Sequence, residues 1–81
     1  MGVTKMSYFA VVTKYHGPGN VRGSRISATA NRSRVYMEYD PALKVDANHA
    51  AAASKLCDKM GWTGDLIGGA LPGSGYAFVL A

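Results

Sequence analysis

Residues 25–38 read Arg-Ile-Ser-Ala-Thr-Ala-Asn-Arg-Ser-Arg-Val-Tyr-Met-Glu, and this stretch decides the fold. Apolar and polar residues alternate on both sides of Asn31-Arg32, as in two half-buried strands joined by a tight hairpin turn. The first strand is predicted to start at Arg22 or Ser24 and to end at Ala30, and the second covers residues 34–38. The side chains expected to face the core are Ile26, Ala28, Ala30, Val35 and Met37, and those expected on the other side are Arg25, Ser27, Thr29, Arg34, Tyr36 and Glu38.

The regions on either side of this hairpin complete the predicted sheet. Residues 7–15 are aromatic, β-branched and apolar on nearly both sides, as in a central strand. Two further strands are predicted over residues 65–71 and 76–80, with a bulge at Gly68-Gly69 and a turn over residues 72–75.

A helix is predicted between the third and fourth strands, over residues 47–60. Asp46 is its expected N-cap and Gly61 its left-handed terminator. Its apolar face is expected to carry Ala50, Ala53, Leu56, Cys57 and Met60, with Asn48, Lys55, Asp58 and Lys59 largely off it. The sequence therefore predicts a single small α+β domain, residues 1–81, in which one amphipathic helix packs on one face of an antiparallel sheet. The element order is βββαββ, and residues 1–6 are expected to be flexible.

The charge of the chain is unevenly distributed. The net charge is +4 over 81 residues, yet residues 1–36 contain six cations and no acid, while the remainder contains three lysines and five acids. Clustered cations attract phosphates or acidic surfaces. Neither a signal peptide nor a membrane span is apparent, so we expect a cytoplasmic protein without a membrane partner. A chain of this length has a thin core, which makes a homodimer an open alternative.

The loop between the first two strands is rich in glycine and is followed by arginines. Backbone amides at Gly17, Gly19 and Gly23 could form a concave donor site for a phosphate, which Arg22 and Arg25 would contact. The alternative is a simple turn with solvated arginines. Three residues apart on an extended strand, the two arginines leave on opposite faces unless a bulge or turn at Gly23 reorients Arg22.

The outward side of the hairpin is a second candidate site. Arginines interleaved with Tyr36, and with an aromatic residue from the first strand, are typical of sheets that hold single-stranded nucleic acid. Tyr36 is equally compatible with a cross-strand pair or a dimer interface.

Catalysis and metal binding have little support in the sequence. His16 and His49 have no acidic partner at a fixed spacing, and His49 is expected on the helix surface or against Trp62. The lone Cys57 has no CxxC partner. We therefore expect no enzyme, no metal and no cofactor.

Two motifs resemble a family of small uncharacterised accessory proteins of phages, plasmids and bacterial mobile islands. The motifs are Lys14-Tyr15-x-Gly17-Pro18-x-Asn20-x-Arg22-Gly23-Ser24-Arg25-Ile26-x-Ala28 and Leu56-Cys57-x-Lys59-Met60-Gly61-Trp62-Thr63-Gly64. The resemblance implies a mobile-element setting rather than a mechanism.

The leading hypothesis is a non-enzymatic module that binds nucleic acid (DNA or RNA) or another phosphate-bearing ligand. Alternatives are a module that inhibits a host defence protein and a dimer that sequesters a nucleotide. The candidate binding residues are Lys14, Tyr15, His16, Asn20, Arg22, Gly23, Ser24, Arg25, Arg34 and Tyr36.

Overall fold

The computed structural model of the protein describes residues 9–19 and 23–80, so the expected flexibility of residues 1–6 lies outside the described residues. Within them, the elements follow in the predicted order β1β2β3α1β4β5. Their bounds are β1 Val11–His16, β2 Arg25–Ala30, β3 Ser33–Glu38, α1 Val45–Met60, β4 Leu66–Ala70 and β5 Tyr76–Leu80.

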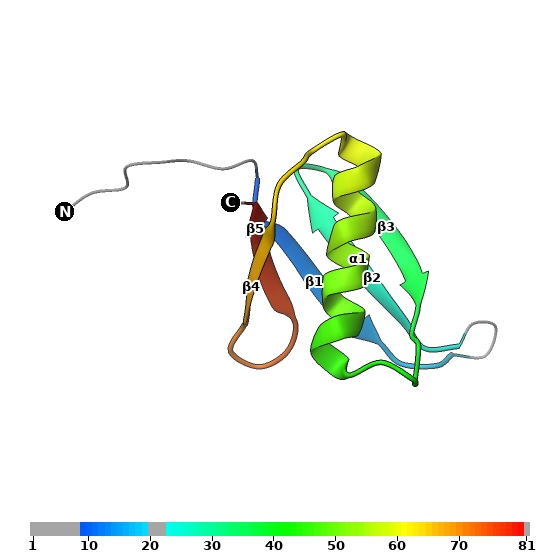
Figure 1. The fold of residues 1–81 in the computed structure, drawn as a ribbon. Coiled ribbons are helices and arrows are strands. Elements are labelled where there is room, and N and C mark those ends of the chain that lie inside the picture. Colours follow the sequence, from blue (N-terminus) through cyan, green and yellow to red (C-terminus); the bar gives the residue numbers. More distant parts are fainter. Residues whose placement is uncertain (1–8, 20–22, 81) are drawn as a thin grey trace.

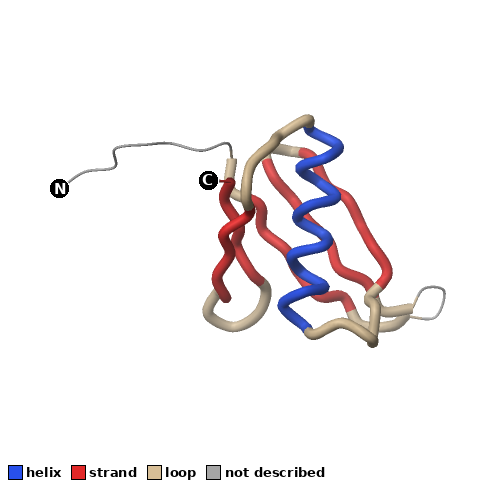
Figure 2. Tube along the Cα trace, in the orientation of Figure 1, coloured by secondary structure: helices blue, strands red, loops and turns tan. Residues whose placement is uncertain are grey.

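The strands form one five-stranded sheet in the spatial order β3-β2-β1-β5-β4, with antiparallel pairing throughout. The helix α1 lies across one face of this sheet, over β1, β2 and β3, and the β4–β5 hairpin extends the sheet to one side (Figure 1). Figure 2 shows the same two layers as one blue helix in front of red strands. The predicted α+β fold with one helix packed on an antiparallel sheet is therefore confirmed.

The β2–β3 hairpin forms as its alternation predicts. Asn31 and Arg32 both have positive φ, 45° and 69°, which matches the right-handed twist of the strands that a two-residue turn joins. Ile26 and Ala28 are fully buried on the helix side. The sequence pattern alone was sufficient here because every second side chain of the hairpin is small or apolar.

The strand β1 is central, as predicted, but its limits differ. It extends through His16, which the sequence assigned to the loop, because His16 pairs with Arg25 in the ladder to β2. Residues 7 and 8 of the predicted strand lie outside the described residues.

The start of α1 corrects two predictions. The helix begins at Val45, so Lys44 occupies the cap position, and Asp46 is an acidic residue of the first turn rather than the N-cap. Asn48 is fully buried rather than off the apolar face. Its side-chain amide accepts from the backbone N–H of Asp40 at 2.8 Å and donates to the carbonyl of the same residue at 2.9 Å. Asn48 thus fixes the β3–α1 connection from inside the helix.

The end of α1 follows the prediction. Gly61 has φ +73°, and the amide of the following residue, Trp62, donates to the carbonyl of Cys57 at 3.0 Å. This is the hydrogen-bond pattern of a glycine-terminated helix.

The core lies between α1 and the sheet, and its buried strand residues come from β1, β2 and β5. Ala52, Ala53 and Leu56 are completely buried against Ile26 and Ala28. Full burial of a leucine or isoleucine side chain contributes about 1.5–3 kcal/mol, and the alanines allow the helix to approach the sheet closely. Over residues 9–19 and 23–80, no helix has the length and apolar character needed to cross a membrane.

The β4–β5 hairpin contains no bulge, so the prediction of one at Gly68-Gly69 is wrong. The register runs without interruption from Leu66 opposite Leu80 to Ala70 opposite Tyr76. Glycine is needed at position 68 for a different reason, because a Cβ there would collide with the ring of Phe78 on the neighbouring strand.

Candidate functional site

The sheet face away from α1 carries a polar surface formed by β1, β2 and β3. In antiparallel strands, directly opposed residues share a face. The ladders oppose His16 to Arg25, Lys14 to Ser27, Ser27 to Tyr36 and Thr29 to Arg34. The cationic face of the protein consists of Lys14, His16, Arg25, Ser27, Thr29, Arg34 and Tyr36.

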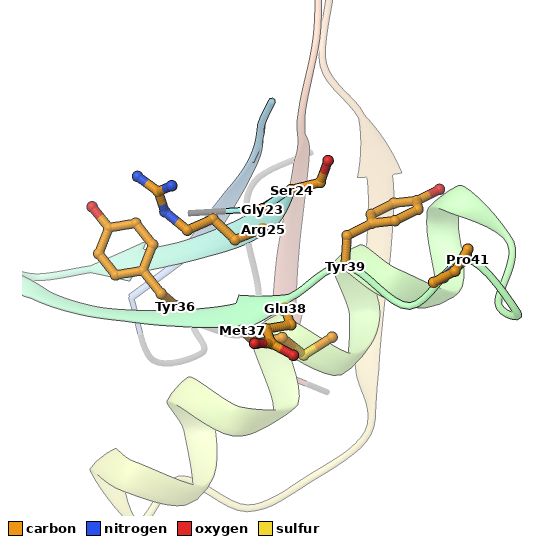
Figure 3. Close-up of a pocket in the computed structure, with 8 residues that line it drawn as sticks. All are labelled: Gly23, Ser24, Arg25, Tyr36, Met37, Glu38, Tyr39 and Pro41. Atoms are coloured by element: carbon orange, nitrogen blue, oxygen red, sulfur yellow. The ribbon is translucent and has the colours of Figure 1, made fainter. Parts of the chain in front are cut away.

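Arg25 and Tyr36 form the centre of the cationic face. The guanidinium carbon of Arg25 lies 5.3 Å from the centroid of the Tyr36 ring, within the range of a cation–π interaction. Both side chains project from the side of the sheet opposite α1 (Figure 3). Tyr36 as a residue remains 39% exposed, so Arg25 does not cover its side chain completely.

Arg25 is incompletely satisfied. Its Nε atom is buried and has no hydrogen-bond partner among the described residues. A buried donor without a partner costs about 1–3 kcal/mol. Glu38 lies directly opposite Arg25 in the ladder and places one negative charge at the edge of this cationic surface.

Arg34 is held across the hairpin by two hydrogen bonds. Its Nε donates to Thr29 Oγ1 at 3.1 Å, and its Nη1 donates to the hydroxyl of Tyr36 at 3.3 Å. These contacts are exposed, and they leave Nη2 as a further donor of the guanidinium fork. The tyrosine is thus flanked by Arg34 at its hydroxyl and by Arg25 over its ring.

His16 adds a second ring to the cationic face. Its Nε2 lies 2.9 Å from Ser27 Oγ, and its ring centroid lies 5.9 Å from that of Tyr36. Ser27 is only 5% exposed although it projects from the open side, because larger neighbouring side chains surround it. The first strand therefore supplies an imidazole to this surface rather than a tyrosine.

Tyr15 and Ser24 lie on the other face of the sheet. Tyr15 opposes the buried Ile26, and its hydroxyl donates to Ser24 Oγ at 2.9 Å. The ring of Tyr15 meets Tyr39 edge-on, with centroids 5.4 Å apart. The structure brings Lys14, His16, Arg25, Arg34 and Tyr36 together on one surface but separates Tyr15 and Ser24 from it.

The glycine-rich loop is only partly described. Asn20 and Arg22 lie outside the described residues, so the face that Arg22 occupies stays a prediction. Gly17, Gly19 and Gly23 have no positive φ, and a Cβ added at any of them would meet no atom within 4 Å. Neither backbone conformation nor crowding therefore requires glycine at these three positions.

A groove borders the cationic face where β2 and β3 meet the loops. It has a volume of about 810 Å³ and is lined by Gly23, Ser24, Arg25, Tyr36, Met37, Glu38, Tyr39 and Pro41 (Figure 3). The groove connects the end of the glycine-rich loop with the arginine–tyrosine pair.

A second pocket, which sequence reasoning missed, lies on the helix side of the sheet. It measures about 480 Å³, and its aromatic wall consists of Tyr15, Tyr39, His49 and Tyr76. His49 is 2% exposed, so its expected place on the helix surface is wrong. Its ring centroid lies 4.4 Å from that of Tyr76.

His49 is fixed by a neighbour on β1. Its Nδ1 lies 2.7 Å from Thr13 Oγ1. Burial lowers the pKa of His49 below its ordinary value of 6.5, because the charged imidazolium is disfavoured there. The signal was present in the sequence, since His49 precedes the apolar Ala53 by four residues and Leu56 by seven, on the same helix face.

Neither metal-binding groups nor similar proteins point to a function for this chain. In the described part of the chain, no three His, Cys, Asp or Glu side chains are grouped so that they could hold a metal ion. Comparisons with protein families, curated proteins and solved structures give no match to this chain. The resemblance to mobile-element accessory proteins stays a prediction.

Proposed function

We propose that the protein is a non-enzymatic binding module for single-stranded nucleic acid, and that the cationic face is its binding surface. The observation that carries the proposal is the exposed Tyr36 ring, with the guanidinium of Arg25 at 5.3 Å and that of Arg34 at its hydroxyl. A base can stack on an aromatic ring while cations beside it contact the phosphates. The phage or mobile-element setting and a cytoplasmic location belong to the same proposal and rest on sequence alone.

The arrangement of charge supports a nucleic-acid ligand over a nonspecific basic surface. Lys14, Arg25 and Arg34 come from three adjacent strands on the same face as the two rings, His16 and Tyr36. Adjacent strands lie about 4.8 Å apart, and Arg34, Lys14 and Arg25 are also offset along the strands, at the levels of Thr29, Ser27 and Arg25 of β2, so the cations are spread over the face rather than stacked at one point. An uncovered sheet with interleaved rings and cations is a recurrent platform for unstacked bases.

The test is a salt titration of binding to a fluorescent random-sequence oligonucleotide, followed by anisotropy. The test variant combines Arg25→Gln with Arg34→Gln, which keeps most of each side-chain stem and removes two charges from the cationic face. The matched control combines Lys44→Gln with Lys59→Gln, two exposed lysines away from that face. Both variants have the same net charge, so a difference in binding between them does not come from the total charge of the protein.

Wild-type affinity is expected to fall steeply with salt. For single strands the slope of log K against log salt is about −0.7 for each phosphate neutralised, so loss of two contacts makes it shallower by about 1.4. The lysine variant should keep the wild-type slope. The proposal is wrong if the wild type does not bind at low salt, or if the two variants weaken binding equally.

A second candidate function is supported by the aromatic pocket on the helix side. Three of its rings, Tyr15, Tyr39 and Tyr76, are at least partly exposed and offer flat surfaces to a single nucleobase, while the buried His49 packs behind Tyr76. Arg25 faces the opposite side of the sheet, so this ligand would be a free nucleotide rather than the strand proposed above. A thermal-shift screen of nucleotides separates the two functions, because a ligand bound only to the folded state raises the melting temperature. A shift that Tyr76→Ala abolishes and the double arginine variant retains would favour the pocket.

A further inference from the structure

The two edges of the sheet differ in how they are protected. The edge strand β3 carries Arg34 and Glu38, and the ammonium of Lys55 on α1 donates to the backbone carbonyl of Tyr36 at 3.0 Å. Charges and covering side chains of this kind discourage pairing with another chain. The β3 edge is therefore guarded.

The edge strand β4 has none of these features. Its sequence is Leu-Ile-Gly-Gly-Ala, residues 66–70, without a charge or a proline. It pairs with β5 along one side in an uninterrupted register and is the last strand of the sheet. No strand of the described residues lies on its other side, so the backbone donors and acceptors that point away from β5 are available to a further strand.

Both faces of β4 are also open. Ile67 is 58% exposed on the side away from α1, and its cross-strand neighbour Val79 is 41% exposed. On the helix side, a hollow of about 420 Å³ separates Gly68 and Ala70 from α1, where Ala50 lines its far wall. Burying the exposed apolar surface of Ile67 and Val79 would stabilise an assembly, because it removes that surface from water.

The sequence of β4 is complementary to itself in the antiparallel direction. With a two-fold axis at Gly68, Leu66 lies opposite the partner's Ala70, and Ile67 lies opposite the partner's Gly69. Each large side chain then faces a small one, and the two copies of Gly68 face each other. Because side chains alternate along a strand, this register also keeps the cationic faces of both copies on the same face of the joined sheet at the seam.

We propose that the protein forms a two-fold symmetric dimer in which β4 pairs antiparallel with β4 of a second copy, centred on Gly68. The two sheets join into one continuous sheet, and the interface is isologous, as expected for a closed dimer. The guarded β3 edges form its two ends. The cationic face, on β1 to β3 of each copy, stays uncovered, so the dimer does not depend on the proposed function.

The experiment measures molar mass by light scattering or sedimentation over a wide range of protein concentration. The test variant is Ile67→Lys. In the proposed dimer it places one lysine from each copy on the same face of the β4–β4 pair, close to each other and opposite the partner's Gly69, so that the two like charges repel. The matched control is Val79→Lys, which adds the same charge to the same face one strand further in. Both replaced side chains are exposed, and circular dichroism verifies that each variant folds.

The expected result is a dimer for the wild type and for Val79→Lys, and a monomer for Ile67→Lys. A mixed sample of labelled and unlabelled protein should also show intermolecular contacts between the Ile67 methyl groups and the partner's Gly69. A monomeric wild type at the highest concentration overturns the proposal. So does a dimer that Ile67→Lys leaves intact, or one that both lysine substitutions abolish equally, since that pattern indicates stacking of sheet faces.

Discussion

Removal of the Asn48 side-chain amide is expected to destabilise the protein strongly. The residue is fully buried in the first turns of α1, and its amide is engaged at both ends. Oδ1 accepts from the backbone N–H of Asp40 at 2.8 Å. Nδ2 donates to the carbonyls of Asp40 at 2.9 Å and Lys44 at 3.2 Å. Asn48→Ala leaves these backbone groups without their side-chain partner.

The magnitude follows from the two shortest bonds. A typical hydrogen bond contributes about 0.5–1.5 kcal/mol net, and each buried group left unpaired costs about 1–3 kcal/mol. Asp40 is exposed as a residue, so water can reach part of its backbone, and we expect a total loss of about 2–4 kcal/mol. For a domain of this size, that loss lowers the melting temperature by roughly 4–8 °C per kcal/mol.

Urea denaturation followed by circular dichroism measures the effect. Asn48→Asp keeps the size and the Oδ1 acceptor but turns a carboxylate oxygen towards the Asp40 and Lys44 carbonyls. It should therefore destabilise the protein at least as much as alanine at neutral pH. Ser54→Ala, at an exposed position of the same helix, should change stability by no more than about 0.5 kcal/mol. A loss below about 1 kcal/mol for Asn48→Ala would refute the reasoning, because water would then replace the amide adequately.

Three further predictions concern titration, backbone conformation and thiol access. Burial lowers the pKa of His49, so the unfolded chain takes up this proton at a higher pH than the folded protein. The free energy of unfolding should therefore fall as the pH drops below 6.5, by at most about 1.4 kcal/mol per pH unit. In urea denaturation over a range of pH, His49→Gln should remove this part of the pH dependence. Gly75→Ala should lower the melting temperature more than Gly73→Ala does. Both glycines have φ +89°, and an alanine in that conformation costs about 1–2 kcal/mol, but only at Gly75 would the new Cβ also meet the Thr13 carbonyl oxygen, at 2.5 Å. Equal effects of the two substitutions would contradict this prediction. Burial raises the pKa of Cys57, so less of the reactive thiolate is present in the folded protein. Alkylation of Cys57 by iodoacetamide should therefore be at least about tenfold slower in the folded protein than in the urea-unfolded protein. Equal rates would show that the thiol is accessible.

The binding surface was only partly predictable. Alternation along residues 25–38 correctly places Arg25, Arg34 and Tyr36 on one face, because that face is set by the period of the strand alone. The same rule did not tell which β1 ring joins them. The answer depends on where β1 ends. Because β1 extends through His16 and His16 pairs with Arg25, the imidazole of His16, rather than the ring of Tyr15, lies beside Tyr36.

Other sequence predictions failed where the decisive contact is distant along the chain. The Gly68-Gly69 pair indicated a bulge from local propensity, but the ring of Phe78 on β5 accounts for Gly68. Asp46 has the chemistry of an N-cap, yet α1 begins before it, at Val45, and the Asn48 amide holds the β3–α1 connection against the first turns. Local preference was overridden in both cases by packing or hydrogen bonding to another element.

The sequence by itself determined the elements and their order, the hairpin turn at Asn31-Arg32 and the helix stop at Gly61. These features depend on side-chain period and on φ angles, which are properties of neighbouring residues. Only the tertiary structure decided that β1 lies between β2 and β5, that His49 is buried against Tyr76, and that one sheet edge is guarded while β4 is open. The physical reason is that burial, edge exposure and cation–π contacts are relations between segments that only folding brings together.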